Sequence, residues 1–479
     1  MTDVVVAGAG PTGLLLAGDL AAAGVDVTLV ERRAEESNLT RAFAVHARTL
    51  EQLDARGLAE SLVDTGNTVD RLGIFGRTTV ELRSLPSKFP FVLVTPQYSV
   101  EQVLEDRAAR AGARIMRGVR VRGLTQDGEG VTVDCEEAAG ERSQLRASYV
   151  VGTDGHHSTV RDALGLDFPG EAVVRSLVLA DVRMTDPPSG LLTFNANDRG
   201  FFFVVPFGDG WFRVITRDPE HELPDDAPVD MTEIVRLAER VVGTDYGMHD
   251  PRWMSRFHSD ERQVRRYRVG RVFLAGDAAH VHSPAGGMGM NTGLQDAANL
   301  GWKLAAVLND GADDQVLDTY HDERHPVGKM VLRTSGGLIR AALLRWRPAR
   351  VVRDTLAGVV LRVPAVTRRL GLRISGLDIA YRPPPGSRRP VGRRAEDVVG
   401  QDGRRLYDVL RSRRFTLVAP PGFASNDIDG RVEVLPVPEG APRLVRPDGY
   451  VAWAGDDTDS LRATLRGWGA LGPTERSTG

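Results

Sequence analysis

The feature that most constrains the fold is a glycine-rich turn between a predicted strand and a predicted helix near the start of the chain. Residues 4–7 predict a short buried strand, residues 14–21 a helix and residues 27–30 a second strand. Between the first strand and the helix, Gly8, Gly10 and Gly13 form the pattern G-x-G-x-x-G. Such glycines let the backbone approach a pyrophosphate at the helix N-terminus, and Glu31 follows the second strand, where a carboxylate binds a ribose. The segment therefore predicts a dinucleotide-binding βαβ unit.

Further strand patterns place this unit in a larger, discontinuous sheet. Residues 149–152 and 272–275 are apolar runs that each lead into an Asp-containing turn, as expected of buried strands. Residues 175–265 contain alternating strands with a turn at 207–210, which predicts an inserted antiparallel sheet. Helices follow, and the proline-rich run 382–386 marks a linker to a small third domain. The predicted fold is α/β: a Rossmann-like domain at 1–174 and 266–382, the insert at 175–265, and a C-terminal domain at 383–479.

A second glycine-rich loop indicates which dinucleotide is bound. Gly276 and Asp277 follow the predicted strand at 272–275, and the loop at 283–291 contains Gly286, Gly287 and Gly289 before the next helix. An aspartate at a strand end can hold a polyol hydroxyl, and backbone N–H groups at a helix N-terminus can stabilise negative charge on the edge of a flat ring. These properties fit a flavin, and we expect FAD.

Composition excludes several other classes of protein. The chain has 61 Lys and Arg against 64 Asp and Glu, a net charge of −3, so its charge does not indicate a nucleic-acid or membrane partner. A single cysteine, Cys135, excludes an intramolecular disulfide and fits a reducing compartment. We find no export signal and no apolar run of the roughly 20 residues that a spanning helix needs. The sequence therefore predicts a cytoplasmic protein with small-molecule partners.

Together these segments resemble a known family. The glycine turn at 8–13, Asp154 and Gly155 with Ser158 and Arg161 after them, and the run 275–280 with the loop at 287–291 are similar to the class A FAD-dependent aromatic hydroxylases, whose prototype is para-hydroxybenzoate hydroxylase. The resemblance extends over the whole chain and is strongest to hydroxylases of aromatic polyketides. It implies a thioredoxin-like C-terminal domain, non-covalent FAD, and NADPH or NADH as the reductant.

The resemblance also assigns residues to the cofactor. It implies that Gly13 contacts the pyrophosphate, Glu31 the adenosine ribose and Asp277 the ribitol and pyrophosphate region, with Arg41 and Gln97 near the centre of the cofactor. The complete set of expected cofactor-binding residues is Gly8, Gly10, Pro11, Thr12, Gly13, Glu31, Arg32, Arg41, Gln97, Val121, Asp154, Gly155, Gly276, Asp277, Pro284, Gly287, Gly289, Met290 and Asn291.

A substrate pocket is expected on the inserted sheet above the flavin. We expect Phe201, Phe203 and Trp211 to line it, although aromatic residues that alternate along strands more often form a sheet core. Met288 replaces a glutamine that many relatives have, and we expect it to border the flavin ring and the substrate pocket. His46 is the candidate catalytic residue because it could assist proton movement from a phenol, with packing or hydrogen bonding as the alternative role.

Two further patterns have structural rather than functional interpretations. His280 and His282 form H-x-H, but the sequence offers no third ligand, so we expect no metal there. The arginine-rich stretch 345–373 predicts helices that bury one face and solvate the other. Its arginines alternate with the apolar residues Val351, Val352, Leu361, Val363, Leu370 and Leu372. A role of these helices in partner binding, including a homodimer, stays open.

The predicted function is that of an FAD-dependent monooxygenase. The resemblance implies that the protein uses NAD(P)H and O2 to hydroxylate a phenolic polycyclic substrate, such as an aromatic polyketide, through a flavin hydroperoxide. The same chemistry could instead insert oxygen beside a ketone, as in a Baeyer-Villiger reaction, or inactivate an aromatic antibiotic, because the shape of the pocket decides what is oxidised. A non-catalytic flavin-binding module is the alternative from another class.

Overall fold

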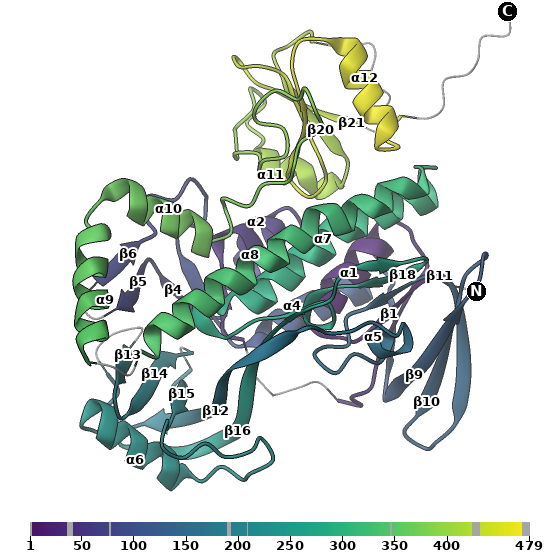
Figure 1. Ribbon diagram of the computed structural model, residues 1–479. Coiled ribbons are helices and arrows are strands. Elements are labelled where there is room, and N and C mark those ends of the chain that lie inside the picture. Colours follow the sequence, from purple (N-terminus) through teal and green to yellow (C-terminus); the bar gives the residue numbers. More distant parts are fainter. Residues whose placement is uncertain are drawn as a thin grey trace, which may run out of the picture.

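The fold is given by a computed structural model, which describes residues 2–35, 42–75, 78–188, 193–207, 209–344, 347–423 and 432–471. Figure 1 shows a large body built from the first 380 residues, with the C-terminal domain packed on it beside the two longest helices, α7 (Met288–Asn309) and α8 (Asp318–Ala342). Within the described residues, no helix is long and apolar enough to span a membrane.

The first domain contains an eight-stranded sheet assembled from distant parts of the chain. Its main path is β17 (Arg268–Val269), β18 (Val272–Leu274), β11 (Arg142–Gly152), β1 (Thr2–Ala7), β2 (Val27–Glu31) and β8 (Arg114–Arg117), and β10 (Val131–Glu137) and β9 (Val119–Gln126) extend it from β11. The pairs from β18 to β8 are parallel. Because parallel strands end at the same edge, the loops after β1, β2, β11 and β18 lie together. The predicted discontinuous sheet is confirmed.

Helices cover this sheet and complete its apolar core. The amino-terminal helix α1 (Pro11–Ala22) packs against α7 and α4 (Gln97–Arg110). Buried valines and leucines of β1, β2, β11 and β18 form one continuous cluster with these helices. Shorter elements complete this part of the chain: α2 (Ala47–Asp54), α3 (Ala59–Val63), α5 (Thr159–Ala163), η1 (Gly276–Ala278), η2 (Ala285–Gly287) and η3 (Asp314–Leu317).

The inserted domain is an antiparallel sheet, as the sequence predicts. Its strand order is β13 (Thr193–Asn197), β14 (Gly200–Pro206), β15 (Phe212–Arg217), β12 (Gly170–Met184), β16 (Met248–Gln263) and β19 (His280–Val281). The strand β12 begins at Gly170, five residues before the predicted boundary, and β19, from the later part of the chain, pairs with the end of β16. One face packs on α6 (Met231–Val242) through Phe202, while the opposite face, with Phe201, packs toward α8.

Two small sheets formed by the chain between β2 and α4 were not predicted from the sequence. They are β3 (Ala44–Val45), β7 (Val92–Val94) and β4 (Asn67–Val69) in one, and β5 (Arg71–Phe75) with β6 (Thr78–Glu81) in the other. Such short strands leave little periodicity to detect. They matter because they close one side of the cavity described below.

The arginine-rich segment forms two helices, α9 (Arg347–Val360) and α10 (Pro364–Ile374). The expectation that both bury an apolar face is wrong for α9. Leu361 and Leu370 are partly buried, but Val351, Val352 and Val363 are exposed to solvent. In Figure 1 these helices lie at one end of the molecule, beside β5 and β6.

The C-terminal domain contains a four-stranded sheet with its own core. The strand order is β21 (Val432–Pro436), β20 (Phe415–Ala419), β22 (Arg443–Val445) and β23 (Val451–Ala454), with β20 and β21 parallel and the other pairs antiparallel. The helices α11 (Leu406–Val409), η4 (Leu410–Ser412) and α12 (Thr458–Gly467) pack around it.

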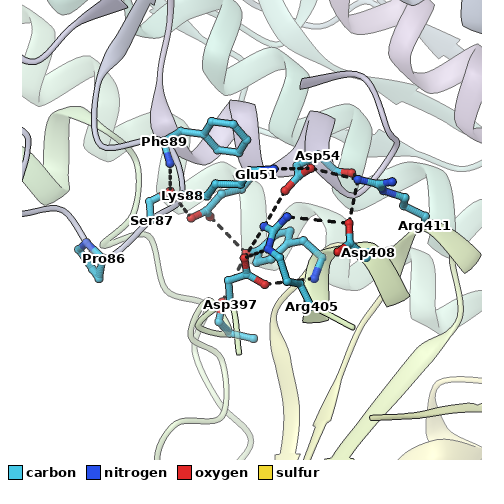
Figure 2. Close-up of polar contacts among 12 residues, drawn as sticks. Glu51, Asp54, Pro86, Ser87, Lys88, Phe89, Asp397, Arg405, Asp408 and Arg411 are labelled. Atoms are coloured by element: carbon cyan, nitrogen blue, oxygen red, sulfur yellow. Dashed lines mark hydrogen bonds and ion pairs between the residues drawn. The ribbon is translucent and has the colours of Figure 1, made fainter. Parts of the chain in front are cut away.

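Charged side chains attach the C-terminal domain to α2. Figure 2 shows Asp54 between Arg405 and Arg411 of the C-terminal domain, with a distance of 2.8 Å from the Arg405 guanidinium to the Asp54 carboxylate. The fully buried Arg48 donates to the Tyr407 hydroxyl and to the Asp448 carbonyl, each at 2.7 Å. Glu51 binds Arg48 at 3.0 Å. The helix α2 is therefore a shared part of both domains.

Candidate active site

The pyrophosphate loop, residues 8–13, joins β1 to α1 and depends on its glycines. Gly8 has a φ of +103°, and a Cβ on it would lie 2.5 Å from the Thr153 carbonyl oxygen. A Cβ on Gly13 would lie 2.0 Å from the Gly8 oxygen. By contrast, a Cβ on Gly10 would meet no protein atom within 4 Å, and Gly10 caps α1 without a side-chain acceptor. The loop thus presents a helix N-terminus to open space, as pyrophosphate binding requires.

Thr153 is a member of this site that sequence reasoning missed. Its hydroxyl lies 2.8 Å from the Ala7 carbonyl and 2.9 Å from the Gly8 carbonyl, so it ties the end of β11 to the glycine turn. The only sequence signal was its position next to Asp154, which the resemblance had already singled out.

Glu31 lies at the end of β2 with both carboxylate oxygens engaged. The Ala9 N–H donates to one oxygen at 2.7 Å, and the Arg33 N–H and guanidinium donate to the other at 2.9 and 3.0 Å. Burial raises the pKa of Glu31, but these hydrogen bonds outweigh it and the pKa is lowered. The carboxylate therefore stays ionised, as an acceptor for ribose hydroxyls must. The expected neighbour Arg32 is exposed, and Arg33 rather than Arg32 contacts Glu31.

The flavin loop, residues 283–291, leads into the N-terminus of α7. Gly286 and Gly287 have φ of +80° and +61°, and no side chain caps the helix. A Cβ on Gly289 would meet no protein atom within 4 Å. The loop is held in place by Asn291, which donates to the Ala44 carbonyl at 2.9 Å and accepts the His46 N–H at 2.8 Å. The side chain of Asn291 thus organises the loop, and the backbone is left to face a ligand.

The pyrophosphate loop meets η1 at Thr12 and Gly276. A Cβ on Gly276, whose φ is +59°, would lie 2.7 Å from the Thr12 hydroxyl, so η1 contacts the first turn of α1. Asp277 is exposed on η1 beside this contact, at the end of β18. Two helix N-termini, an ionised carboxylate at the end of β2 and an exposed aspartate at the end of β18 therefore border one edge of the sheet. This arrangement fits an anionic dinucleotide such as FAD.

Other expected cofactor residues have structural partners in the protein. Asp154 accepts from the Ser158 hydroxyl at 2.5 Å and from the Val160 N–H, and burial raises its pKa. Gln97 accepts the Ala42 N–H at 3.1 Å. Val121 packs in the main core, and Met290 packs against it. Pro284 and Gly287 line the cavity described next, and Pro11 is the first residue of α1. Gly155 has a φ of +84°, with open space where a Cβ would lie. Arg41 lies outside the described residues.

An apolar cavity of about 290 Å³ lies between the flavin loop and the inserted sheet. Phe201 and Phe203 of β14 line it, and Phe203 packs on Phe43 with ring centroids 5.6 Å apart. The intervening Phe202 points to the opposite face of the sheet. Lining residues that the sequence did not indicate come from several other elements: Phe43, Ala44, Leu72, Gly73, Val92, Val94, Leu177, Phe194, Ile215, Leu338, Ile339, Ala342 and Ile374.

Among the described residues that line this cavity, His46 is the only one with a titratable side chain. It is buried at the N-terminus of α2. Burial lowers the pKa of His46 to about 4, although backbone groups of Ile374 and Gly286 favour the protonated form. The imidazole is therefore neutral at neutral pH.

Two expected pocket residues lie elsewhere. The Met288 side chain packs among Val327, Val331 and Ile374, on the side of the flavin loop that faces α8, and it does not line the cavity. Trp211 precedes β15 and lies under the guanidinium of Arg252, 4.6 Å from ring centroid to Cζ. Neither position follows from strand alternation, because each depends on how neighbouring elements pack.

His280 and His282 are held by hydrogen bonds within the protein. His280 contacts His282 at 2.8 Å and Asp296 at 2.6 Å, and Asp296 also pairs with the buried Arg324 at 2.7 Å. Asp296 accepts the Gly276 N–H at 3.1 Å as well. This buried cluster supports η1 from behind, and Asp296 is a supporting residue that the sequence did not reveal.

Comparisons with known proteins agree with this geometry. Residues 1–335 match the model of the FAD binding domain, and residues 388–471 match that of the aromatic-ring hydroxylase C-terminal domain. Rifampicin monooxygenase of Streptomyces venezuelae is 40% identical over 479 residues, covering 98% of each chain. The 12-dehydrotetracycline 5-monooxygenase/anhydrotetracycline 6-monooxygenase of Streptomyces rimosus is 38% identical, over 97% of this chain and 98% of that one.

A solved structure supports the same assignment. CabE, an aromatic hydroxylase from angucycline biosynthesis, superposes with a TM-score of 0.88 at 36% identity, over 98% of this chain and all of the other. Coverage of this extent means that both the cofactor-binding body and the C-terminal domain are shared. With its two glycine loops at one sheet edge and an apolar cavity beside them, the chain belongs to the FAD-binding aromatic-ring hydroxylases and is an FAD-dependent aromatic monooxygenase.

Proposed function

We propose that this monooxygenase hydroxylates a phenolic, polycyclic substrate such as an aromatic polyketide, with NADPH or NADH as the reductant. The observation that carries the proposal is the apolar cavity between the flavin loop and the inserted sheet. Its volume of about 290 Å³ is close to the lower end of the range for small-molecule sites, and its walls are aromatic and aliphatic. A flat fused-ring substrate suits such walls.

The residues of the cavity act by positioning the substrate and excluding water. The rings of Phe43 and Phe203 offer an aromatic surface against which a substrate ring can stack. The apolar walls keep water from the reacting atoms, and the loop at Gly286 and Gly287 brings the backbone to the cavity edge. Fixing the ring in one orientation selects which carbon is oxidised.

The low pKa of His46 bears on its predicted catalytic role. A neutral imidazole with a pKa of about 4 is a weak base, so it is poorly suited to remove a proton from a phenol. We propose the packing and hydrogen-bonding alternative, in which His46 holds the flavin loop against α2. This assignment leaves the substrate hydroxyl oriented by the cavity walls and by backbone groups.

The cofactor is assigned to the two glycine loops. The pyrophosphate loop and Glu31 would hold the ADP part of FAD, and Asp277 with the flavin loop would hold the ribitol and the ring. When bound and reduced, FAD supplies the electrons that activate O2 for oxygenation of the substrate. Only one dinucleotide-binding βαβ unit lies in the described part of the chain, so the nicotinamide cofactor would bind transiently at the flavin site.

We propose the predicted division into domains, with the insert beginning at Gly170, and a thioredoxin-like C-terminal domain in a cytoplasmic enzyme. The sheet order β21-β20-β22-β23, with one parallel pair and two antiparallel pairs, supports the thioredoxin-like assignment. The single cysteine of the chain, Cys135, lies in β10 of the first domain. The C-terminal domain therefore has no dithiol, and we propose that it has a structural role or aids association.

A second candidate is oxidative inactivation of an aromatic antibiotic by the same chemistry. The identity of 40% with rifampicin monooxygenase favours it. Both reactions need an apolar cavity beside the flavin. Insertion of oxygen beside a ketone, as in a Baeyer-Villiger reaction, is a third outcome that the products would reveal.

The test is a product assay with the purified, FAD-loaded protein. It is incubated with NADPH or NADH, air, and a panel that contains anhydrotetracycline, an angucycline-type phenol and rifampicin, and the products are read by mass spectrometry and NMR. A polycyclic phenol that gains one oxygen on a ring carbon supports the proposal. Turnover of rifampicin alone supports the second candidate. If neither NADPH nor NADH bleaches the flavin with any member of the panel present, the result would point to a non-catalytic module.

A further inference from the structure

The helix α9 presents a continuous apolar stripe to solvent. The stripe consists of Val351, Val352, Leu356, Val359 and Val360, each of which is at least 45% exposed, and Val363 continues it at 48%. The spacing of three, four and five residues places them along one side of the helix. Contiguous apolar surface of this kind marks an interaction site more often than scattered exposed residues do.

The stripe faces outward because the opposite side of α9 is anchored. The Arg353 guanidinium donates to the Ala341 carbonyl at 2.7 Å and to the Ala342 carbonyl at 3.4 Å, in the last turn of α8. A cation at a helix C-terminus satisfies carbonyls that have no partner inside the helix. At the other end, Leu361 packs in the cluster that contains Val80 and Leu82. The orientation of α9 is therefore fixed with its apolar stripe outward.

The surroundings of the stripe are basic. Residues 345–373 contain eight arginines and a single acidic residue, Asp354, in a chain whose net charge is −3. Arg362, Arg368 and Arg369 are exposed next to the stripe. A second copy docked through the same face would bring these arginines toward their own counterparts, because a twofold interface pairs a surface with itself. Charge complementarity therefore favours an anionic occupant.

The composition of the stripe distinguishes a lipid surface from an acidic protein. Its members are valine and leucine only, whereas protein interfaces are enriched in aromatic residues and methionine at their centres. An aliphatic face flanked by arginines is typical of helices that lie in the membrane interface. We propose that α9 and the start of α10 dock on an anionic lipid bilayer, with the stripe among the acyl chains and the arginines at headgroup phosphates.

The position of α9 gives this docking a use. The helix joins α8, which contributes Leu338, Ile339 and Ala342 to the cavity wall, to α10, which contributes Ile374. Docking would therefore hold one wall of the apolar cavity close to the bilayer, where apolar aromatic compounds partition. The inference rests on the surface alone and does not depend on the proposed reaction. It departs from the sequence-based expectation of no membrane partner, which rested on the net charge of −3 and on helices at 345–373 that bury an apolar face.

The test is vesicle binding by the purified, FAD-loaded protein, measured by co-sedimentation. Vesicles of phosphatidylcholine alone are compared with vesicles that also contain phosphatidylglycerol. We expect binding to the anionic vesicles only, with a decrease at high salt because exposed charges are screened. Val359→Asp, at a position 59% exposed, should lower binding about tenfold. The matched control is Val399→Asp, at a position 60% exposed outside α9, which should leave binding unchanged.

Three results would overturn the proposal. One is equal binding to neutral and anionic vesicles, and another is an equal effect of the two valine substitutions. The third is a parent protein that binds no vesicles and forms a dimer in analytical ultracentrifugation, which Val359→Asp dissociates. The stripe would then be an interface with a second copy of the chain. Melting temperatures of both variants are compared with the parent to confirm that each is folded.

Discussion

The cofactor loops and the substrate cavity lie side by side but are built in opposite ways. The pyrophosphate loop and the flavin loop are two short segments in which backbone groups face the ligand and glycines make room for it. The cavity has side-chain walls that come from α8, α10, the inserted sheet and both small sheets. A site made of backbone leaves a local sequence pattern, because only glycine fits there. A site made of side chains leaves none, because any apolar residue of suitable size can line it.

The largest effect should come from Gly13→Ala. The added Cβ would lie 2.0 Å from the Gly8 oxygen and 2.5 Å from the Thr153 hydroxyl, and backbone cannot move aside as a flexible side chain would. We expect a loss of about 5 kcal/mol in unfolding free energy, with FAD affinity lower by about 100-fold or more. Urea unfolding and the flavin absorbance of the purified variant measure the two effects. A variant with full FAD content would show that the loop is not built around its backbone.

Substitutions of two neighbouring phenylalanines of β14 should have different effects, because one ring lies in the sheet core and the other lines the cavity. Phe202→Ala removes a fully buried ring that packs toward α6, so it should cost about 3–5 kcal/mol in unfolding free energy and leave the substrate KM unchanged. Phe203→Ala, one residue along, should cost less stability and raise KM about tenfold. Urea unfolding and steady-state kinetics of both variants give the comparison. If Phe203→Ala and Phe202→Ala have the same KM, Phe203 does not contact the substrate.

His46 should make the protein less stable in weak acid. Its pKa is about 4 when folded and 6.5 in the unfolded chain, so between these values the unfolded state binds more protons and stability falls as pH falls. From pH 7 to pH 5 this amounts to about 2 kcal/mol. In His46→Gln this part of the pH dependence should disappear, as measured by urea unfolding at both pH values. His249→Gln, at an exposed position, is the control. An unchanged pH dependence in His46→Gln would exclude a buried neutral imidazole.

The smallest effect is expected for Gly10→Ala, which should change FAD affinity without changing protein stability. Gly10→Ala adds a Cβ that meets no protein atom within 4 Å, so the apoprotein should be as stable as the parent. If the open space belongs to the pyrophosphate, FAD affinity should fall about tenfold. Fluorescence titration with FAD measures this change. Gly128→Ala, which is equally unobstructed and lies in a distant turn, should leave both properties unchanged. Unaltered FAD affinity in Gly10→Ala would show that the pyrophosphate does not bind beside Gly10.

The glycine turn and the carboxylate at the end of β2 could be predicted from the sequence because local physics determines them. Gly8, Gly13 and Glu31 have steric or electrostatic roles that few other residues could fill, and their spacing is set by one strand and one helix. Asn291 was also singled out, but its amide turned out to bind Ala44 and His46 rather than to face outward. That difference depends on β3, a two-residue strand that leaves no detectable pattern.

The rest of the site could not be predicted because it depends on tertiary packing. Met288 turns toward α8 because Val327 and Val331 leave an apolar space there, which no spacing rule reveals. Ile374 lies far from the flavin loop in sequence and reaches the cavity only because α9 and α10 fold back beside β6. The exposed stripe of α9 shows the same limit, since an amphipathic pattern predicts a helix but does not say what covers its apolar side.

The ion pairs on α2 restrict how this enzyme can be recombined with its relatives. Arg48, Glu51 and Asp54 are buried against the C-terminal domain, and His46, one residue before the helix, lines the cavity. If a chimera replaced residues 388–471 with a segment that lacks Arg405 and Tyr407, each buried charge left without its partner would cost about 3–5 kcal/mol. Crossover points would therefore have to transfer α2 together with the last domain. The helix α2 and the C-terminal domain are more than 300 residues apart in sequence, but they would have to be exchanged together.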